Sequence, residues 1–229
     1  MDAHWPKVVD ESHTLSLLKS GRSISRFGDG EFEIILGNSI GFQKKNGSLA
    51  LKLRDILNSD GECLIGIPNL LEINQGSADY WSERDGRYNE LLNGEKTYHS
   101  SFISRPDKIQ SINNPDFFSE FCSVWKGRRA IFLIGDGNQD IAPFNGSPSI
   151  YENTAEYEFW KFSSKHAFRD YDSILEKCSS QPRETIFAIC LGPTATVLSF
   201  DLCNLGFQAI DLGSFPRFYF WRMNPSPNS

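Results

Sequence analysis

Residues 185–212 read TIFAICLGPTATVLSFDLCNLGFQAIDL, and this stretch decides the fold. Thr185–Leu191 is almost continuously apolar, as expected for a strand that is covered on both faces. Thr194–Asn204 has the spacing of a helix that ends before Gly206, and Phe207–Leu212 is a second apolar strand. A strand, a helix and a strand in this order predict a βαβ unit with parallel strands.

The same alternation extends through the rest of the chain. Further strands are expected at residues 24–27, 63–67, 98–103 and 129–134. Helices are expected at 10–19, from residue 31 to 36, after a cap at Ser48, at 77–93 with a break near Gly86, after Asn114-Pro115, and at 170–178. We therefore predict one α/β domain over residues 1–223, with a Rossmann-like, mostly parallel sheet, helices on both faces, and a disordered tail at 224–229. Ligands of such sheets bind beyond the carboxyl ends of the strands, so functional residues are expected in the strand-to-helix turns.

The first of these turns is Arg26-Phe27-Gly28-Asp29-Gly30-Glu31. Gly28 and Gly30 let the backbone turn tightly beside a ligand. In extended backbone the carboxylates of Asp29 and Glu31 would project to the same side, and such oxygens bind hard divalent cations together with a substrate phosphate. The turn therefore predicts a metal–diphosphate site, in which Arg26 pairs with an acid or a phosphate. An ordinary Gly-Asp-Gly turn, with Glu31 at the electropositive start of a helix, fits the same residues.

The second turn, at residues 191–196, joins the clearest strand to the clearest helix. Free amides after Gly192 and the hydroxyl of Thr194 or Thr196 suit a phosphate or a carboxylate. A capped helix with a proline near its start explains the same residues equally well.

Two further positions have a weaker signal. Arg105 follows the strand expected at 98–103 and could anchor an anion or form a surface ion pair. Gly135-Asp136-Gly137 follows another strand and could hold a nucleotide, as in methyltransferase-type Rossmann folds, or be a polar loop.

Composition and missing motifs exclude several classes of protein. The 229 residues contain 23 Lys and Arg against 29 Asp and Glu, a net charge of -6, whereas a nucleic-acid binder usually has a basic excess. No HExxH or GxxxxGK[ST] motif occurs, and the five cysteines include no CxxC pair. The longest apolar run is far shorter than the roughly 20 residues of a membrane span, and the N-terminus has no apolar signal segment. We expect a cytoplasmic protein with no nucleic-acid partner and no membrane span.

The motifs together resemble one known family. Residues 25–31 are similar to the N-terminal motif of the bacterial GT-D-type glycosyltransferases, a family long catalogued as a domain of unknown function. Residues 191–198 and 206–213 are similar to its C-terminal block. Shorter landmarks occur in the same order between these blocks, at 42–43, 66–68, 102–106 and 167–168. The resemblance covers about residues 11–221.

The resemblance implies a Rossmann-like enzyme that transfers a sugar from a nucleotide diphosphate donor, expected to be a UDP-sugar, to a glycan or glycoconjugate acceptor. The family's Asp-x-Glu motif maps onto Asp29 and Glu31, which implies a divalent metal, Mn²⁺ or alternatively Mg²⁺. Donor contacts are then expected at Arg26, Gly28, Gly30, Arg105, Gly192 and Thr194. A homodimer, or association with other glycosyltransferases, is a further expectation.

The sequence departs from the family after its last predicted strand. Ser214, Pro216 and Phe220 stand where the family tends to have His, Asp and Glu. Asp211 is retained, and Asp136 could substitute for an expected Glu, so these two are the candidate bases. The departure keeps open a non-catalytic relative that binds a sugar nucleotide or a glycan, and the 135–137 turn keeps open a methyltransferase. The aromatic residues at 215–221 could form an acceptor platform, a partner-docking patch or core.

Overall fold

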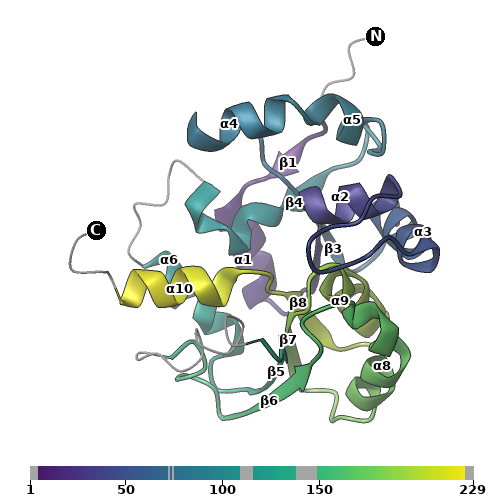
Figure 1. Ribbon diagram of the computed structural model, residues 1–229. Coiled ribbons are helices and arrows are strands. Elements are labelled where there is room, and N and C mark those ends of the chain that lie inside the picture. Colours follow the sequence, from purple (N-terminus) through teal and green to yellow (C-terminus); the bar gives the residue numbers. More distant parts are fainter. Residues whose placement is uncertain (1–4, 72, 74, 109–115, 138–148, 225–229) are drawn as a thin grey trace.

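The computed structural model describes residues 5–71, 73, 75–108, 116–137 and 149–224. Within these residues, eight strands form one sheet in the order β1-β4-β3-β2-β8-β7-β5-β6 (Figure 1). Every neighbouring pair is parallel, which confirms the predicted α/β class. The strands are β1 Val8–Val9, β2 Ile24–Arg26, β3 Leu64–Ile67, β4 Tyr98–Ser100, β5 Arg129–Gly135, β6 Glu156–Phe162, β7 Ile186–Cys190 and β8 Gln208–Asp211.

Helices cover both faces of the sheet (Figure 1). One apolar cluster joins the sheet to α2 Asp29–Ile35, α3 Gly47–Leu57, α4 Gln75–Ser82, α5 Asp85–Asn89, α8 Tyr171–Ser179 and α9 Pro193–Asn204. A second cluster joins the opposite face to α1 Glu11–Lys19, α6 Phe117–Cys122 and α10 Phe215–Met223. Short 3₁₀ segments are η1 Ser101–Ser104, η2 Pro106–Lys108, η3 Ser123–Trp125 and η5 Ala167–Asp170.

The central strands explain the continuous apolar runs of the sequence. In β5, Ile131 and Leu133 enter the first cluster, whereas Ala130, Phe132 and Ile134 enter the second. Because successive side chains of a strand point to opposite faces, a strand covered on both faces needs apolar residues at every position.

Several local predictions were wrong in detail. Asn46, not Ser48, caps α3, because its side chain accepts the amide proton of Leu49 at 2.9 Å. The break expected near Gly86 is confirmed, because α4 ends at Ser82 and α5 begins at Asp85, but α5 already ends at Asn89. The strand expected at 98–103 ends at Ser100 and continues as η1. Residues 114–115, expected to open a helix, lie outside the described residues, as do 225–229 of the expected tail.

Among the described residues, two strands and one α-helix have no counterpart in the prediction: β1, β6 and α10. β1 and β6 are the two edge strands of the sheet. β6 reads EYEFWKF and is mostly exposed or half-buried, so it lacks the apolar run that identified the central strands.

Candidate active site

A cavity of about 420 Å³ opens at the carboxyl ends of the central strands. Arg26 is the last residue of β2, Asp211 is the last residue of β8, and Ser101 follows β4. Gly192 lies two residues beyond β7, at the start of α9. The cavity therefore occupies the position where open parallel sheets bind ligands.

A buried ion pair lies against this cavity. Nη2 of Arg26 is 3.1 Å from Oδ1 of Asp211, and the side chains are 11% and 4% exposed. The second carboxylate oxygen accepts the Arg26 amide proton at 3.2 Å and lies 3.1 Å from the Thr196 hydroxyl. Nη1 of Arg26 donates to the Ser101 carbonyl at 2.9 Å. Burial raises the pKa of Asp211 and the Arg26 guanidinium opposes that shift, while the hydrogen bonds hold both side chains in one orientation.

The two acids of the Asp-x-Glu motif lie in the first turn of α2. Asp29 accepts the phenol proton of Tyr80 on Oδ2 at 2.6 Å. Glu31 turns back toward the helix start, and its Oε2 accepts the Gly28 amide proton at 2.8 Å. The assumption of extended backbone at these residues was therefore wrong, although both acids line the cavity. Burial, followed by the nearby charge of Asp211, raises the pKa of Glu31 to about 7.

The start of α9 forms one side of the cavity together with Phe42. Gly192 has a φ of 55°, and a Cβ at this position would lie 2.6 Å from Cε2 of Phe42. Phe42 is 47% exposed, yet its backbone is anchored, because His166 donates its amide proton to the Phe42 carbonyl at 2.8 Å. The Lys44 amide in turn donates to Nδ1 of His166 at 3.1 Å. A glycine is thus required where an aromatic ring closes on the helix start.

Arg105 and Lys108 add cations to the cavity lining. Arg105 forms two 2.8 Å hydrogen bonds to the carboxylate of Asp107, and its guanidinium lies 5.1 Å from the ring centre of Phe218. Lys108 donates to the Ser77 hydroxyl at 3.0 Å. The ion-pair interpretation of Arg105 therefore holds, while the residue also faces the cavity.

The structure gathers most of the predicted site residues in this one cavity. Its lining includes Arg26, Gly28, Asp29, Gly30, Glu31, Arg105, Gly192 and Asp211. Thr194 is fully buried and is not among the lining residues, and its hydroxyl finds no hydrogen-bond partner in the described part of the chain. Asp136 is exposed at the end of β5 and binds Ser164 through hydrogen bonds of 2.8 and 2.6 Å, which lower its pKa. The 135–137 turn is thus separate from the described lining of the cavity.

Several lining residues had no role in the sequence prediction. Tyr80 and Lys108 come from α4 and η2, where no motif marks them. Gly213 has a φ of 49° and lies against Arg26, so that a Cβ there would collide with Nη2 of the guanidinium. Thr196 was considered only as an anion contact, and here its hydroxyl supports Asp211.

The donor set of the cavity suits a hard divalent cation. Asp29 and Glu31 supply carboxylate oxygens, the ligand type that Mg²⁺ and Mn²⁺ prefer. Within the described residues, no group of three or more Asp, Glu, His or Cys side chains could hold a metal by itself. A cation at these two acids would therefore need oxygens from water and from a phosphate ligand, as Mg²⁺ in phosphate-binding sites usually does.

The sheet is parallel throughout the described residues, and a cavity lined by acidic residues lies beyond the carboxyl ends of its central strands. These features define an α/β fold that binds its ligand at the carboxyl ends of the strands. The family model for the glycosyltransferase GT-D fold matches residues 24–226, and the chain belongs to this family. The predicted resemblance to the GT-D-type glycosyltransferase family is therefore confirmed.

Solved structures have the same fold. One, described as a domain of unknown function 1792 with a distinct glycosyltransferase fold, is 32% identical. It has a TM-score of 0.84 over 94% of this chain and 81% of its own. Another, a new glycosyltransferase from Streptococcus sanguinis, is 24% identical with a TM-score of 0.83 over 95% of this chain and 84% of its own, which supports the fold alone.

Longer proteins contain a region similar to this chain. Glycosyltransferase GlyD of Streptococcus pneumoniae serotype 4 is 24% identical over 96% of this chain and 28% of its own length. A Streptococcus gordonii protein named "Probable glycosyl transferase Gly" is 27% identical over 90% of this chain and 31% of its own length. The chain thus spans less than a third of either relative. None of the helices in the described residues has the length and apolar character needed to cross a bilayer.

Proposed function

We propose that this chain transfers a sugar from a nucleotide diphosphate donor, a UDP-sugar, to a glycan or glycoconjugate acceptor in a metal-dependent reaction. The observation that supports this most is the meeting of Asp29, Glu31, Arg26 and Gly192 around one cavity. These residues come from two distant parts of the sequence, and both parts carry the family's motifs.

The charge balance of the cavity supports a role for a cation. Among the described residues, its lining contains three cationic side chains, Arg26, Arg105 and Lys108, and three acids, Asp29, Glu31 and Asp211. Each cation already faces a carboxylate: Arg26 binds Asp211, whereas Arg105 and Lys108 both lie near Asp107. A diphosphate would add negative charge that these paired cations do not neutralise. When bound, a divalent cation neutralises the diphosphate and stabilises charge on the leaving group.

The protein's own residues would orient the donor. Asp29 and Glu31 would hold the cation, with Asp29 steadied by the hydrogen bond from Tyr80. Arg26 is held by Asp211 and by the Ser101 carbonyl, so it would meet a phosphate oxygen without losing much further side-chain freedom. The start of α9 at Gly192 would offer amide protons and the positive end of the helix dipole to a second anionic or sugar oxygen.

The candidate bases differ in their surroundings. Both carboxylate oxygens of Asp211 accept hydrogen bonds from protein groups, which supports a role in positioning Arg26. Its role as a base stays a prediction, and Asp136 gains no support because it is not among the residues that line the cavity.

The non-catalytic alternative rests on the altered segment after β8. Ser214 lines the cavity, and Pro216 and Phe220 belong to α10, where Phe215 and Tyr219 enter the core. A segment that packs as core in place of the family's acids is compatible with a relative that binds the donor and does not turn it over.

Calorimetry separates these functions. UDP and a set of UDP-sugars are titrated with and without Mn²⁺ into the wild type, Asp29→Asn and Glu31→Gln, and UDP release is then measured over a broad acceptor panel. Asp55→Asn is the matched control, because Asp55 is an exposed acid on α3. We expect Mn²⁺-dependent binding in the wild type and the control, a loss of at least about tenfold in affinity in the two site variants, and UDP release with some acceptor.

Each other outcome has a distinct meaning. Binding that needs Mn²⁺ and Asp29 without UDP release would favour the non-catalytic alternative. Absence of any Mn²⁺-dependent nucleotide binding in folded wild-type protein would refute both.

A further inference from the structure

Exposed aromatic side chains are concentrated around the cavity at the carboxyl ends of the strands. Within the described residues, the aromatic side chains that are exposed are those of Phe42, Tyr80, Tyr157 and Trp221. Phe42 and Tyr80 line the cavity itself. Trp221 is the most exposed of the four, at 55%, and belongs to α10. A single exposed aromatic ring is common on a protein surface, but several at one cavity are typical of a site for a ligand with apolar faces.

Helix α10 continues the wall of the cavity outward. Its N-cap residue, Ser214, lines the cavity, and Figure 1 shows the helix running outward from the end of β8. Phe215 and Tyr219 are buried in the second apolar cluster. Phe218 is only half-buried and Trp221 is exposed. One side of α10 therefore belongs to the core, and another side presents two aromatic rings, which we call the aromatic platform.

Phe218 connects Trp221 to the cavity. The two rings of the platform meet edge to face, with ring centres 5.3 Å apart and planes at 83°. The ring centre of Phe218 also lies 5.1 Å from the guanidinium of Arg105, which lines the cavity. Arg105 is held in turn by two hydrogen bonds to the carboxylate of Asp107. A chain of direct contacts therefore leads from the cavity to Trp221.

We propose that the aromatic platform binds a sugar ring of a glycan acceptor, at a distance from the sugar that reacts. The inference rests on the proposed function, because it assigns the acceptor of that transfer. One face of a sugar ring carries C–H bonds, and the electron-rich face of an aromatic ring attracts them. A guanidinium has five N–H donors, of which the Asp107 carboxylate accepts two, so Arg105 would also donate to sugar hydroxyls beside the platform.

The place of Trp221 along α10 defines the size of the acceptor. Trp221 follows Ser214 by two turns of helix, which at a rise of about 1.5 Å per residue amounts to about 10 Å along the axis. This distance exceeds the width of one sugar ring, so a monosaccharide at the cavity would not reach Trp221. The structure therefore favours an oligosaccharide or a longer glycan chain as acceptor.

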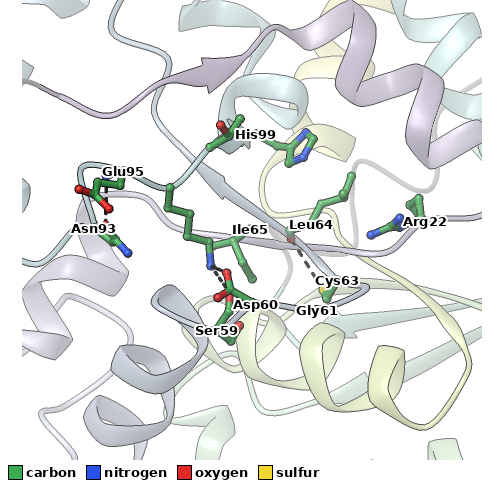
Figure 2. A pocket seen from close by; sticks show the side chains of 12 residues that line it. Arg22, Ser59, Asp60, Gly61, Cys63, Leu64, Ile65, Asn93, Glu95 and His99 are labelled. Atoms are coloured by element: carbon green, nitrogen blue, oxygen red, sulfur yellow. Dashed lines mark hydrogen bonds and ion pairs between the residues drawn. The ribbon is translucent and has the colours of Figure 1, made fainter.

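A second cavity, of about 410 Å³, is the alternative place for a glycan. It lies at the amino ends of β2, β3 and β4, and Figure 2 shows Arg22, Asp60 and Glu95 among its lining. The lining residues that the structure describes there include no Phe, Tyr or Trp. A sugar at this edge of the sheet would also lie opposite the edge at which the donor is proposed to bind, so this cavity could not present an acceptor to the donor.

Oligosaccharide binding tests the proposal without the need for turnover. The full chain, with and without UDP and Mn²⁺, is applied to an array of glucose, galactose and N-acetylglucosamine oligomers of increasing length, and calorimetry then measures the affinities of those that bind. We expect oligomers to bind more tightly than the single sugars. Trp221→Ala should weaken oligomer binding by at least about tenfold, whereas Trp221→Phe should retain most of it. Binding of UDP with Mn²⁺ should be unchanged in both variants, because Trp221 is not among the described residues that line the cavity.

Two variants are matched controls. Tyr157→Ala removes an exposed aromatic ring on β6, and Glu95→Ala changes the second cavity, so both should bind oligomers like the wild type. Circular dichroism checks that each variant is folded, as expected for changes at exposed residues.

Four results would overturn the proposal: equal oligomer affinity in Trp221→Ala and the wild type, a loss in Glu95→Ala alone, binding of no sugar on the array, or a Trp221→Ala variant that loses only self-association in light scattering. Failure of the proposed function gives a different result. If UDP and Mn²⁺ do not bind while oligomers still bind through Trp221, the proposed donor is wrong and the glycan site remains.

Discussion

Replacing Gly213 by alanine would test how firmly the buried ion pair holds Arg26. Gly213 has a φ of 49°, a left-handed conformation that side chains rarely adopt. A Cβ there would collide with Nη2 of Arg26, the atom that binds Asp211 at 3.1 Å, and would lie 3.1 Å from Cζ. The substitution therefore strains the backbone and also displaces the guanidinium.

The two costs can be separated by a second glycine. Gly127 has a φ of 68°, and a Cβ there would meet nothing within 4 Å, so Gly127→Ala carries the backbone cost alone. That cost is about 1–2 kcal/mol. Gly213→Ala adds the loss of a hydrogen bond between charged groups that are almost fully buried, worth about 1.5–3 kcal/mol. We expect a total loss of about 2.5–5 kcal/mol for Gly213→Ala.

Urea unfolding at pH 7 measures both variants, and calorimetry with UDP and Mn²⁺ measures donor binding. Gly213→Ala should be at least about 1.5 kcal/mol less stable than Gly127→Ala. It should also bind the donor more weakly, because Arg26 is displaced, while Gly127→Ala should bind like the wild type. Equal destabilisation by the two substitutions would show that Arg26 moves aside freely, and the ion pair would then not be the rigid part of the site.

Three further predictions address other parts of the molecule. Gly192→Ala should weaken donor binding much more in the wild type than in a Phe42→Ala background, because the added Cβ would lie 2.6 Å from the Phe42 ring. Calorimetry of donor binding to the wild type, both single variants and the double variant measures this difference. Phe215→Ala should lower the free energy of unfolding in urea by about 3–5 kcal/mol, because the ring is fully buried and its centre lies 4.2 Å from that of the stacked Phe121 ring. Trp221 is 55% exposed, so Trp221→Ala should lower it by less than about 1 kcal/mol. Burial lowers the pKa of His99 from 6.5 to about 4. As the pH falls from 6.5 toward 4, the unfolded chain therefore binds a proton before the folded chain does, and the free energy of unfolding should decrease. In His99→Gln, urea unfolding over the same pH range should show a smaller decrease in the free energy of unfolding.

The strands that the sequence predicts most clearly are those that are covered on both faces of the sheet. β5 and β7 are visible in the sequence because both of their faces need apolar residues. β6 has one neighbouring strand in the described sheet and is mostly exposed or half-buried. Charged residues therefore interrupt its sequence, and it lacks the apolar run that predicts a buried strand. No helix was predicted at α10, although Phe215 and Tyr219 occur at the i, i+4 spacing of a helix and are both buried.

Some residues of the candidate site could be predicted from the sequence, and others could not. Residues at the ends of predicted strands, such as Arg26 and Asp211, could be named in advance, because parallel strands bring their carboxyl ends to one edge. Tyr80 and Lys108 could not, because their place in the cavity depends on tertiary packing: α4 contacts η1 through Trp81 and Phe102, and η2 packs near η1 and α10. No local pattern encodes that arrangement.

The two acids of the Asp-x-Glu motif both line the cavity, although the geometric reason for choosing them, an extended backbone, was wrong. In a helix, residues two apart point about 200° apart around the axis, so Asp29 and Glu31 cannot share a side as they would in a strand. Side chains of a helix lean toward its amino end, however, and in the first turn nothing of the helix lies ahead of them. Glu31 demonstrates this, because its carboxylate reaches back to the Gly28 amide while it lines the cavity. The point at which α2 begins, directly after β2, therefore places both acids in the cavity, and their spacing in the sequence matters less than their position in that first turn.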